Sequence, residues 1–238
     1  ARRVGDQWQV YSSGANENTY TDNWRRRYYA FRYMIESLRN METPVRVKPI
    51  NLYYHFYSAE REDGLNSLKA ILDHVRGQYV APIAASRFAA IVDGFLGARI
   101  RQIGDRRWRI ENRDGLETVR FDHASMTAVD FARSVGVIGQ THFQGSLYVA
   151  LDSAVEDPIV ALVGYDRPDR APDADVPYLV EARWRVERLE RQAAGWRFRA
   201  EGFGPGQFVW KVPAPGRFSV TADAGEGLLP REDGGPRR

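Results

Sequence analysis

The hydrophobic pattern of this sequence changes its period at Gly97, so the two halves of the chain need different folds. Before Gly97, apolar side chains recur every three or four residues over 24–40, 61–77 and 86–97, which predicts amphipathic helices. After Gly97, apolar residues alternate with arginines and other polar residues, which predicts strands with one apolar face. A helix-containing part is therefore followed by an all-β part.

Two apolar runs separate the predicted helices. Residues 50–56 (INLYYHF) are nearly all apolar or aromatic, which is typical of a strand buried on both faces in a parallel sheet, and residues 79–83 predict a shorter strand. The order helix–strand–helix–strand–helix indicates the α/β class. Two strands do not make such a sheet. We therefore expect the remaining strands to come from sequence outside this chain, which starts without Met or a secretory signal.

The second half predicts an antiparallel β-sheet or sandwich module of about eight strands in a meander. Strands 107–111 and 119–121, joined by the turn NRDG, predict a hairpin. Ala182, Trp184 and Val186 are expected on one face of a later strand. The predicted domains are the end of a (β/α) barrel in 1–97, the accessory β module in 98–222 and a disordered tail in 223–238, which is rich in Gly, Pro and charge.

Composition excludes several function classes. The 238 residues contain no cysteine, which rules out a disulfide framework, a zinc finger, an iron–sulfur site and a cysteine nucleophile. No apolar run reaches about 18 residues, so no membrane span is predicted. The 34 basic and 31 acidic residues leave a net charge of only +3, with acids interspersed among the bases, which argues against nucleic acid as a partner.

His55 is the strongest candidate for a catalytic residue. It lies at the carboxyl end of the predicted strand 50–56, where reacting groups project in open α/β sheets and in barrels. An imidazole there could act as a general acid toward a leaving amine, although a strand-end histidine bonded to a backbone carbonyl has the same sequence signature. His74, His123 and His142 are expected to be structural, and no spacing typical of metal ligands, a nucleophile elbow or a phosphate-binding loop occurs.

A polar segment before the first predicted helix is a candidate sugar-binding loop. It combines amides, a carboxylate and aromatic rings, which together can hold a sugar by hydrogen bonds and ring contacts. A loop that merely caps the helix would look the same. The arginine–aromatic alternation over 183–199 is a weaker candidate for a polyanion-binding face. The candidate substrate-binding residues are Asn16, Glu17, Asn18, Tyr20, Asn23 and Trp24.

Three segments together resemble one family: NENTYTDNW with the following RYYAFRYMIE, then KPINLYYHFYSAEREDGLNSLKAI, then YVAPIAASRFAAIV. The similarity, strongest over 16–95, is to the C-terminal part of Pel-type exopolysaccharide deacetylases, periplasmic enzymes of biofilm matrix synthesis in Gram-negative bacteria. The resemblance implies a polysaccharide-deacetylase (β/α) barrel in which a divalent, zinc-like metal activates water to hydrolyse N-acetyl groups of amino sugars. It also implies periplasmic localisation.

Only one catalytic position of that family maps onto this chain. The resemblance places the late general-acid histidine at His55 and the late substrate-contacting motif at 16–24, whereas the aspartate base and the metal ligands have no counterpart here. We therefore expect the chain to be part of a periplasmic polysaccharide N-deacetylase and to be inactive alone. Its expected partners are an amino-sugar polysaccharide and a scaffold protein of the export machinery. The alternative is a non-catalytic carbohydrate-binding or scaffolding module of an export system.

Overall fold

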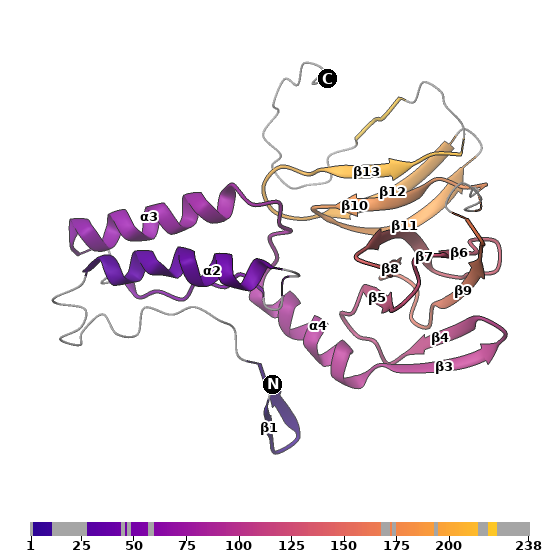
Figure 1. Cartoon of the computed structure of the whole chain (residues 1–238), viewed down its shortest axis with the longest axis horizontal. Helices are drawn as coiled ribbons and strands as arrows, with labels where there is room; N and C mark the ends of the chain where they lie inside the picture. The colour runs from indigo at the N-terminus through magenta and orange to yellow at the C-terminus, as the bar shows by residue number, and fades with distance from the viewer. Residues whose placement is uncertain are drawn as a thin grey trace.

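The structure, a computed structural model, is a mixed fold of mostly β-strands with few helices, and it describes residues 2–10, 28–43, 46, 49–56, 60–167, 172, 175–192, 195–213 and 219–222. This confirms the mixed α and β class at the coarse level. No barrel is closed within these residues. Figure 1 shows α2 (Met34–Glu42) and α3 (Glu62–Arg76) side by side on one side of the molecule and the main sheets on the other, with α4 (Ala85–Gly97) between them. No helix in the described part of the chain is long and apolar enough to cross a membrane.

The predicted helices are confirmed over their described residues. The first comprises a 3₁₀ turn, η2 (Tyr28–Tyr33), that continues into α2, and α3 follows after residue 60. α3 carries Glu62 and Asp63 in its first turn, where carboxylates stabilise the positive end of the helix dipole. Buried side chains of η2, α2 and α3 form one small apolar cluster, whose fully buried members include Leu38 and Ile71.

The two predicted strands before Gly97 are wrong. Apart from a single bridging position at Tyr53, residues 49–55 and 79–84 have no regular secondary structure and belong to no strand. Tyr53 is 48% exposed and Phe56 is 94% exposed, so the predicted burial on both faces is also wrong. The physical reason is that a strand of a parallel sheet is covered and hydrogen-bonded by its neighbours, and no described strand pairs with either segment.

The β module contains two main sheets that share one core. The five-stranded sheet has the order β13-β10-β7-β8-β5 and the four-stranded sheet has the order β3-β4-β9-β6. Buried side chains of both sheets, including Ile110, Leu147 and Val160, belong to one apolar cluster, so the sheets pack face to face. The strands are β3 (Arg99–Gly104), β4 (Arg107–Glu111), β5 (Thr118–Phe121), β6 (Thr127–Val129), β7 (Val137–Phe143), β8 (Ser146–Leu151), β9 (Ile159–Gly164), β10 (Tyr178–Ala182) and β13 (Phe208–Lys211).

The prediction of a β-sheet module after Gly97 is confirmed, but the predicted pairing of its strands is wrong. β4 forms a hairpin with β3 and also pairs with β9, while β5 pairs with β8, so the hairpin of 107–111 with 119–121 is wrong. The meander is also wrong, because strands cross between the two sheets, and β10 pairs with β7 in parallel at Leu179 and Gly139. Gly139 is needed there, because a Cβ would lie 2.1 Å from the carbonyl oxygen of Leu179. Alternation identifies a strand's faces but not its partner.

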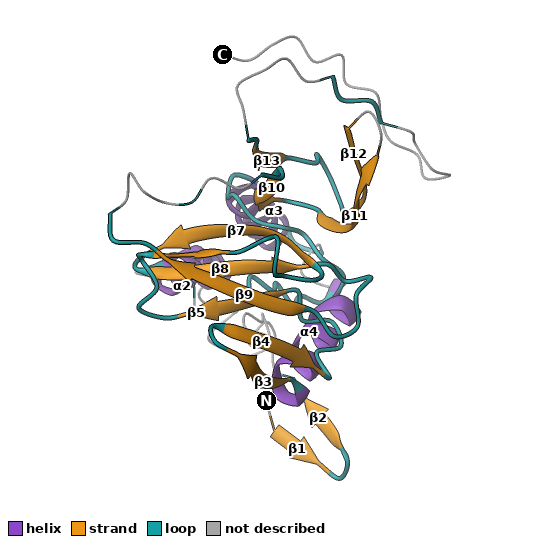
Figure 2. Cartoon of the chain, turned by 90° about the vertical axis from the view of Figure 1, so that its right-hand side faces the viewer, coloured by secondary structure: helices purple, strands orange, loops and turns teal. Residues whose placement is uncertain are grey.

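A hairpin of β11 (Arg185–Gln192) and β12 (Gly195–Glu201) covers part of the outer face of the five-stranded sheet. Its Val186 and Phe198 belong to a second cluster with Ile138 of β7 and Leu179 of β10. Figure 2 shows this hairpin beside β10 and β13, and the small hairpin of β1 (Arg2–Val4) and β2 (Gln7–Gln9) near the end of α4. Among the described residues, this hairpin therefore covers one side of the outer face of the five-stranded sheet.

Helix α4 is fixed directly to the β module. The backbone N–H of Gly115 donates to the carbonyl oxygen of Ala90 over 3.2 Å. At Gly94 the approach is closer still, because a Cβ there would lie 1.9 Å from the carbonyl oxygen of Arg113. The three predicted domains, 1–97, 98–222 and 223–238, stay predictions, and the last lies outside the described residues. The close backbone contacts of α4 nevertheless attach this helix to the strands that follow it.

Candidate functional site

His55 lies in the extended segment between α2 and α3 and is half-buried. Its ring makes an edge-to-face contact with the ring of Tyr53, with the centroids 4.9 Å apart. The six residues predicted to bind substrate, Asn16, Glu17, Asn18, Tyr20, Asn23 and Trp24, lie outside the described residues. The role of His55 therefore stays a prediction that rests on its position after 50–54.

The metal site implied by the family resemblance has no counterpart here. Among the residues that the structure describes, no group of three or more His, Asp or Glu side chains could hold a metal ion. His142, which we expected to be structural, forms a 2.8 Å hydrogen bond through Nε2 with the carbonyl oxygen of Thr127. No such donor set is found in the described part of the chain, and the metal implied by the resemblance stays a prediction.

The clearest concave site is a groove of about 590 Å³ on the outer face of the five-stranded sheet. Its floor is formed by β5, β7, β8 and β10. One wall is the extended segment 81–84 together with the first turn of α4, and the other wall is formed by residues 183–186 and 201–203. The groove thus lies where the segment that leads into α4 meets the β module, and it opens beside the covering hairpin.

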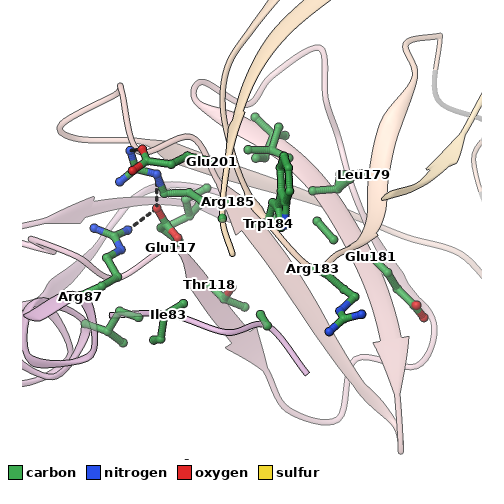
Figure 3. A pocket seen from close by; sticks show the side chains of 18 of the residues that line it. Ile83, Arg87, Glu117, Thr118, Leu179, Glu181, Arg183, Trp184, Arg185 and Glu201 are labelled. Atoms are coloured by element: carbon green, nitrogen blue, oxygen red, sulfur yellow. Dashed lines mark hydrogen bonds and ion pairs between the residues drawn. The ribbon is translucent and has the colours of Figure 1, made fainter. Parts of the chain in front are cut away.

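A network of ion pairs crosses one side of the groove (Figure 3). The carboxylate of Glu117, just before β5, pairs with Arg87 of α4 and lies 3.8 Å from Arg185 of β11. Arg185 in turn contacts Glu187 at 2.9 Å and Glu201 at 3.3 Å. These pairs join α4, β5 and the β11–β12 hairpin across the groove, so they fix its width.

Burial raises the pKa of Glu117, and this effect outweighs the opposing effect of Arg87, Arg185 and Arg113. The neighbouring Glu187 raises the pKa further. A carboxylate with a raised pKa in a groove is a common mark of a functional site. Here two arginines contact it from different elements, so its first role is to hold the walls of the groove together.

Arg183 and Glu181 lie on the opposite side of the groove in Figure 3, and Trp184 lies between them and the ion pairs of Glu117 and Arg185. The Nε of Arg183 donates to the carbonyl oxygen of Val80 over 3.0 Å, which attaches segment 79–84 to the β module. Burial, and then the charge of Glu181 and its hydrogen bond with the phenol, raise the pKa of Tyr79. Arg183, Glu181 and Tyr79 therefore all have interaction partners within this wall of the groove.

Trp184 is held edge-on by the loop after β12. A Cβ at Gly202 would lie 2.3 Å from the indole, and one at Gly206 would lie 3.1 Å from it, so both glycines are needed for this packing. The ring also meets Phe208 edge to face, with the centroids 6.2 Å apart. Its Nε1–H is buried and has no acceptor among the described residues.

Sequence reasoning missed this groove. Arg87, Glu117 and Arg185 come from three distant parts of the chain and show no spacing motif. Trp184 was predicted to face the same side as Ala182 and Val186 of one strand, but the chain bends at residues 183–184 between β10 and β11. That bend places Trp184 in the groove, and the only signal for it in the sequence is the surplus of glycines at 202–206.

The lining of the groove combines charged and apolar side chains. It contains three arginines and three glutamates beside apolar residues such as Ile138 and Leu179, a mixture that suits ligand binding. No protein-family model, no curated protein and no solved structure matches this chain. The function is therefore argued from the residues themselves.

Proposed function

We propose that this chain is part of a polysaccharide N-deacetylase, in which residues 49–83 supply late strands of a (β/α) barrel and His55 acts as the general acid. The observation that carries the proposal is the pair of apolar segments, 50–56 and 79–83, on either side of α3. In a completed barrel these segments would take the two strand positions on either side of the helix of a parallel unit. The substrate is an amino-sugar polysaccharide that carries N-acetyl groups, and the site of action is the periplasm.

The exposure of these two segments supports missing neighbours. Phe56 is 94% exposed, Tyr79 is 53% exposed and Ile83 is 47% exposed, although each belongs to an apolar run. Full burial of one such side chain contributes about 1.5–3 kcal/mol relative to exposure. Strands on either side would cover these side chains and pair the backbone groups of the segments. Exposed apolar side chains of this kind are what an incomplete parallel sheet would show.

In the proposed reaction, the oxygen of water bonds to the carbonyl carbon of the acetyl group and the carbon–nitrogen bond breaks. The protonated imidazole of His55 gives its proton to the departing nitrogen, so the products are acetate and a free amine. We assign the activation of the water to no residue of this chain. Tyr53, in edge contact with the imidazole, is suited to keep its orientation.

The test is acetate release from an N-acetylated amino-sugar polymer by the protein as the cell makes it. His55→Ala should lower the rate by about a hundredfold or more, the usual contribution of a general acid. His55→Gln should behave alike, since it keeps polarity but carries no transferable proton. His74→Ala is the matched control, because His74 is also half-buried but lies on α3, and it should leave the rate unchanged.

Unchanged acetate release in His55→Ala would reject this function. It would favour the alternative, a non-catalytic carbohydrate-binding or scaffolding module of an export system. A folded His55→Ala protein, with the circular dichroism and melting curve of the original, is required for either conclusion.

A further inference from the structure

Strand β3 is an open edge of the four-stranded sheet. The sheet has the order β3-β4-β9-β6, so β3 pairs with β4 on one side, and the hairpin of β1 and β2 forms a separate sheet. Figures 1 and 2 show β3 on the outside of the β module. An edge strand presents backbone N–H and C=O groups with which another strand can pair. Among the described residues, no strand occupies this edge.

The hydrogen bonds of β4 show which backbone groups of β3 point outward. The N–H of Ile110 donates to the carbonyl oxygen of Pro158 over 3.0 Å, so the backbone groups of Ile110 point toward β9 and away from β3. In an antiparallel pair, the residue opposite then directs its own N–H and C=O outward. That residue is Ile100. Its backbone groups are therefore available to an added strand.

The side chain of Ile100 is also uncovered. Residues opposite each other in an antiparallel pair share a face, so Ile100 projects from the same face as Ile110, which is fully buried in the core of the two main sheets. Ile100 is nevertheless 61% exposed, because no described strand lies beyond β3. An apolar residue on an added strand would cover it and extend this face of the sheet.

The opposite face of β3 and β4 carries an excess of positive charge. Arg99 lies opposite Glu111, and Arg101 lies opposite Arg109, so the four side chains share this face. Arg101 contacts Glu111 at 2.7 Å, and its hydrogen bond lowers the pKa of Glu111, as do the charges of Arg109 and Arg99. Three guanidinium groups thus lie near one carboxylate. Arg99 and Arg109 form no ion pair among the described residues.

These features indicate one kind of occupant. A second copy of β3 would place arginines opposite arginines, and like charges directly opposite each other destabilise strand pairing. We propose that β3 binds an extended acidic segment of a partner protein, in which acidic and apolar residues alternate. The segment adds a strand to the sheet and pairs with the backbone of Ile100. Its apolar side chains cover Ile100, and its carboxylates lie beside Arg99 and Arg101.

The experiment is a calorimetric titration of the 238-residue chain with a short peptide in which Glu and Val alternate. One control peptide has the same composition in scrambled order, and another has Lys in place of every Glu. Ile100→Pro removes the outward N–H, and proline is tolerated on an edge strand where the missing N–H faces solvent. Arg99→Gln together with Arg101→Gln removes the charges. Arg76→Gln, at an exposed arginine of α3, is the matched control.

The alternating Glu–Val peptide should bind, and added salt should weaken its binding. The scrambled peptide should bind at least about tenfold more weakly, and the Lys peptide should not bind. Ile100→Pro should weaken binding by about tenfold, the double arginine variant should weaken it by about fivefold or more, and Arg76→Gln should leave it unchanged. Melting curves establish that each variant folds.

Three results would overturn the proposal: no binding of the alternating peptide, equal binding of the scrambled peptide, or unchanged affinity in a folded Ile100→Pro protein. Equal binding of the scrambled peptide would show that charge alone attracts acidic chains to this face. If Ile100→Pro does not fold, unchanged affinity in the double arginine variant overturns the proposal instead. None of these results depends on His55, so this inference stands or fails separately from the proposed function.

Discussion

Gly94→Ala tests whether α4 packs against the β module as closely as it does in the structure. The added Cβ would lie 1.9 Å from the carbonyl oxygen of Arg113 and 2.9 Å from the backbone nitrogen of Leu116. These are backbone atoms, so no flexible side chain can move aside. Arg113 is itself fixed, because it is 3% exposed and its guanidinium donates to the carbonyl oxygens of Leu116, Asp152 and Val155.

The expected effect is a loss of stability in spite of a better helix former. Overpacking against fixed backbone costs about 3 kcal/mol, the upper end of the common range. Replacing glycine with alanine inside a helix contributes about 1 kcal/mol in the opposite direction. We therefore expect the free energy of unfolding to fall by about 2 kcal/mol or more, because the cost of overpacking exceeds the gain in helix propensity.

Urea unfolding, followed by circular dichroism and by tryptophan fluorescence, measures this loss. Gly104→Ala is the control, since a Cβ at Gly104 meets nothing nearer than the Cβ of Arg107 at 3.8 Å. Its unfolding midpoint should stay close to that of the original protein, with the same dependence on denaturant. A Gly94→Ala protein as stable as this control, or more stable, would refute the close packing of α4 and with it the geometry of the groove.

Three further predictions concern stability. Asp152→Ala should lower the free energy of unfolding by about 2–4 kcal/mol in a urea titration. Asp152 is 6% exposed, and its carboxylate accepts hydrogen bonds from three backbone N–H groups that would be left unpaired. The pKa of Glu117 is raised above 4.5, so the folded state binds its proton more tightly than the unfolded state, and stability should fall as pH rises through the interval above 4.5. Glu117→Gln should remove that dependence in urea titrations over this interval, and an unchanged slope would contradict it. Ile71→Ala and Ile110→Ala each leave a cavity at a fully buried position, in two different apolar clusters, and each should lower the free energy of unfolding by about 2–5 kcal/mol. In differential scanning calorimetry, each substitution should therefore shift mainly a different unfolding transition. A single transition shifted by both substitutions would refute two separate cores.

The sequence predicted the helices and strands better than it predicted which strands pair with one another. The helices at 61–77 and 86–97 and the strand at 107–111 follow from local periodicity, and the structure has them at closely similar bounds. Pairing depends on contacts between distant residues, so the hairpin of 107–111 with 119–121 was predicted wrongly.

The candidate site also has one part that local sequence could identify and one part that only contacts between distant residues reveal. His55 could be singled out because its signal is local, an imidazole after an apolar run. The groove could not, because its ion pairs join residues 87, 117 and 185 and because Trp184 enters it only through a bend between β10 and β11. The failed strand predictions at 50–56 and 79–83 have a different cause: the side-chain pattern suits a parallel sheet, and the described residues provide no strands to complete it.

Hydrogen exchange at residues 49–56 and 79–83 tests most directly whether these segments belong to a larger catalytic barrel. It should be measured by mass spectrometry on the 238-residue chain and on the protein as the cell makes it. We expect rapid exchange of these backbone amides in the chain alone and strong protection in the cellular protein, because strands on either side would hydrogen-bond them. Rapid exchange in both would contradict the barrel, and with it the placement of His55 at a catalytic edge.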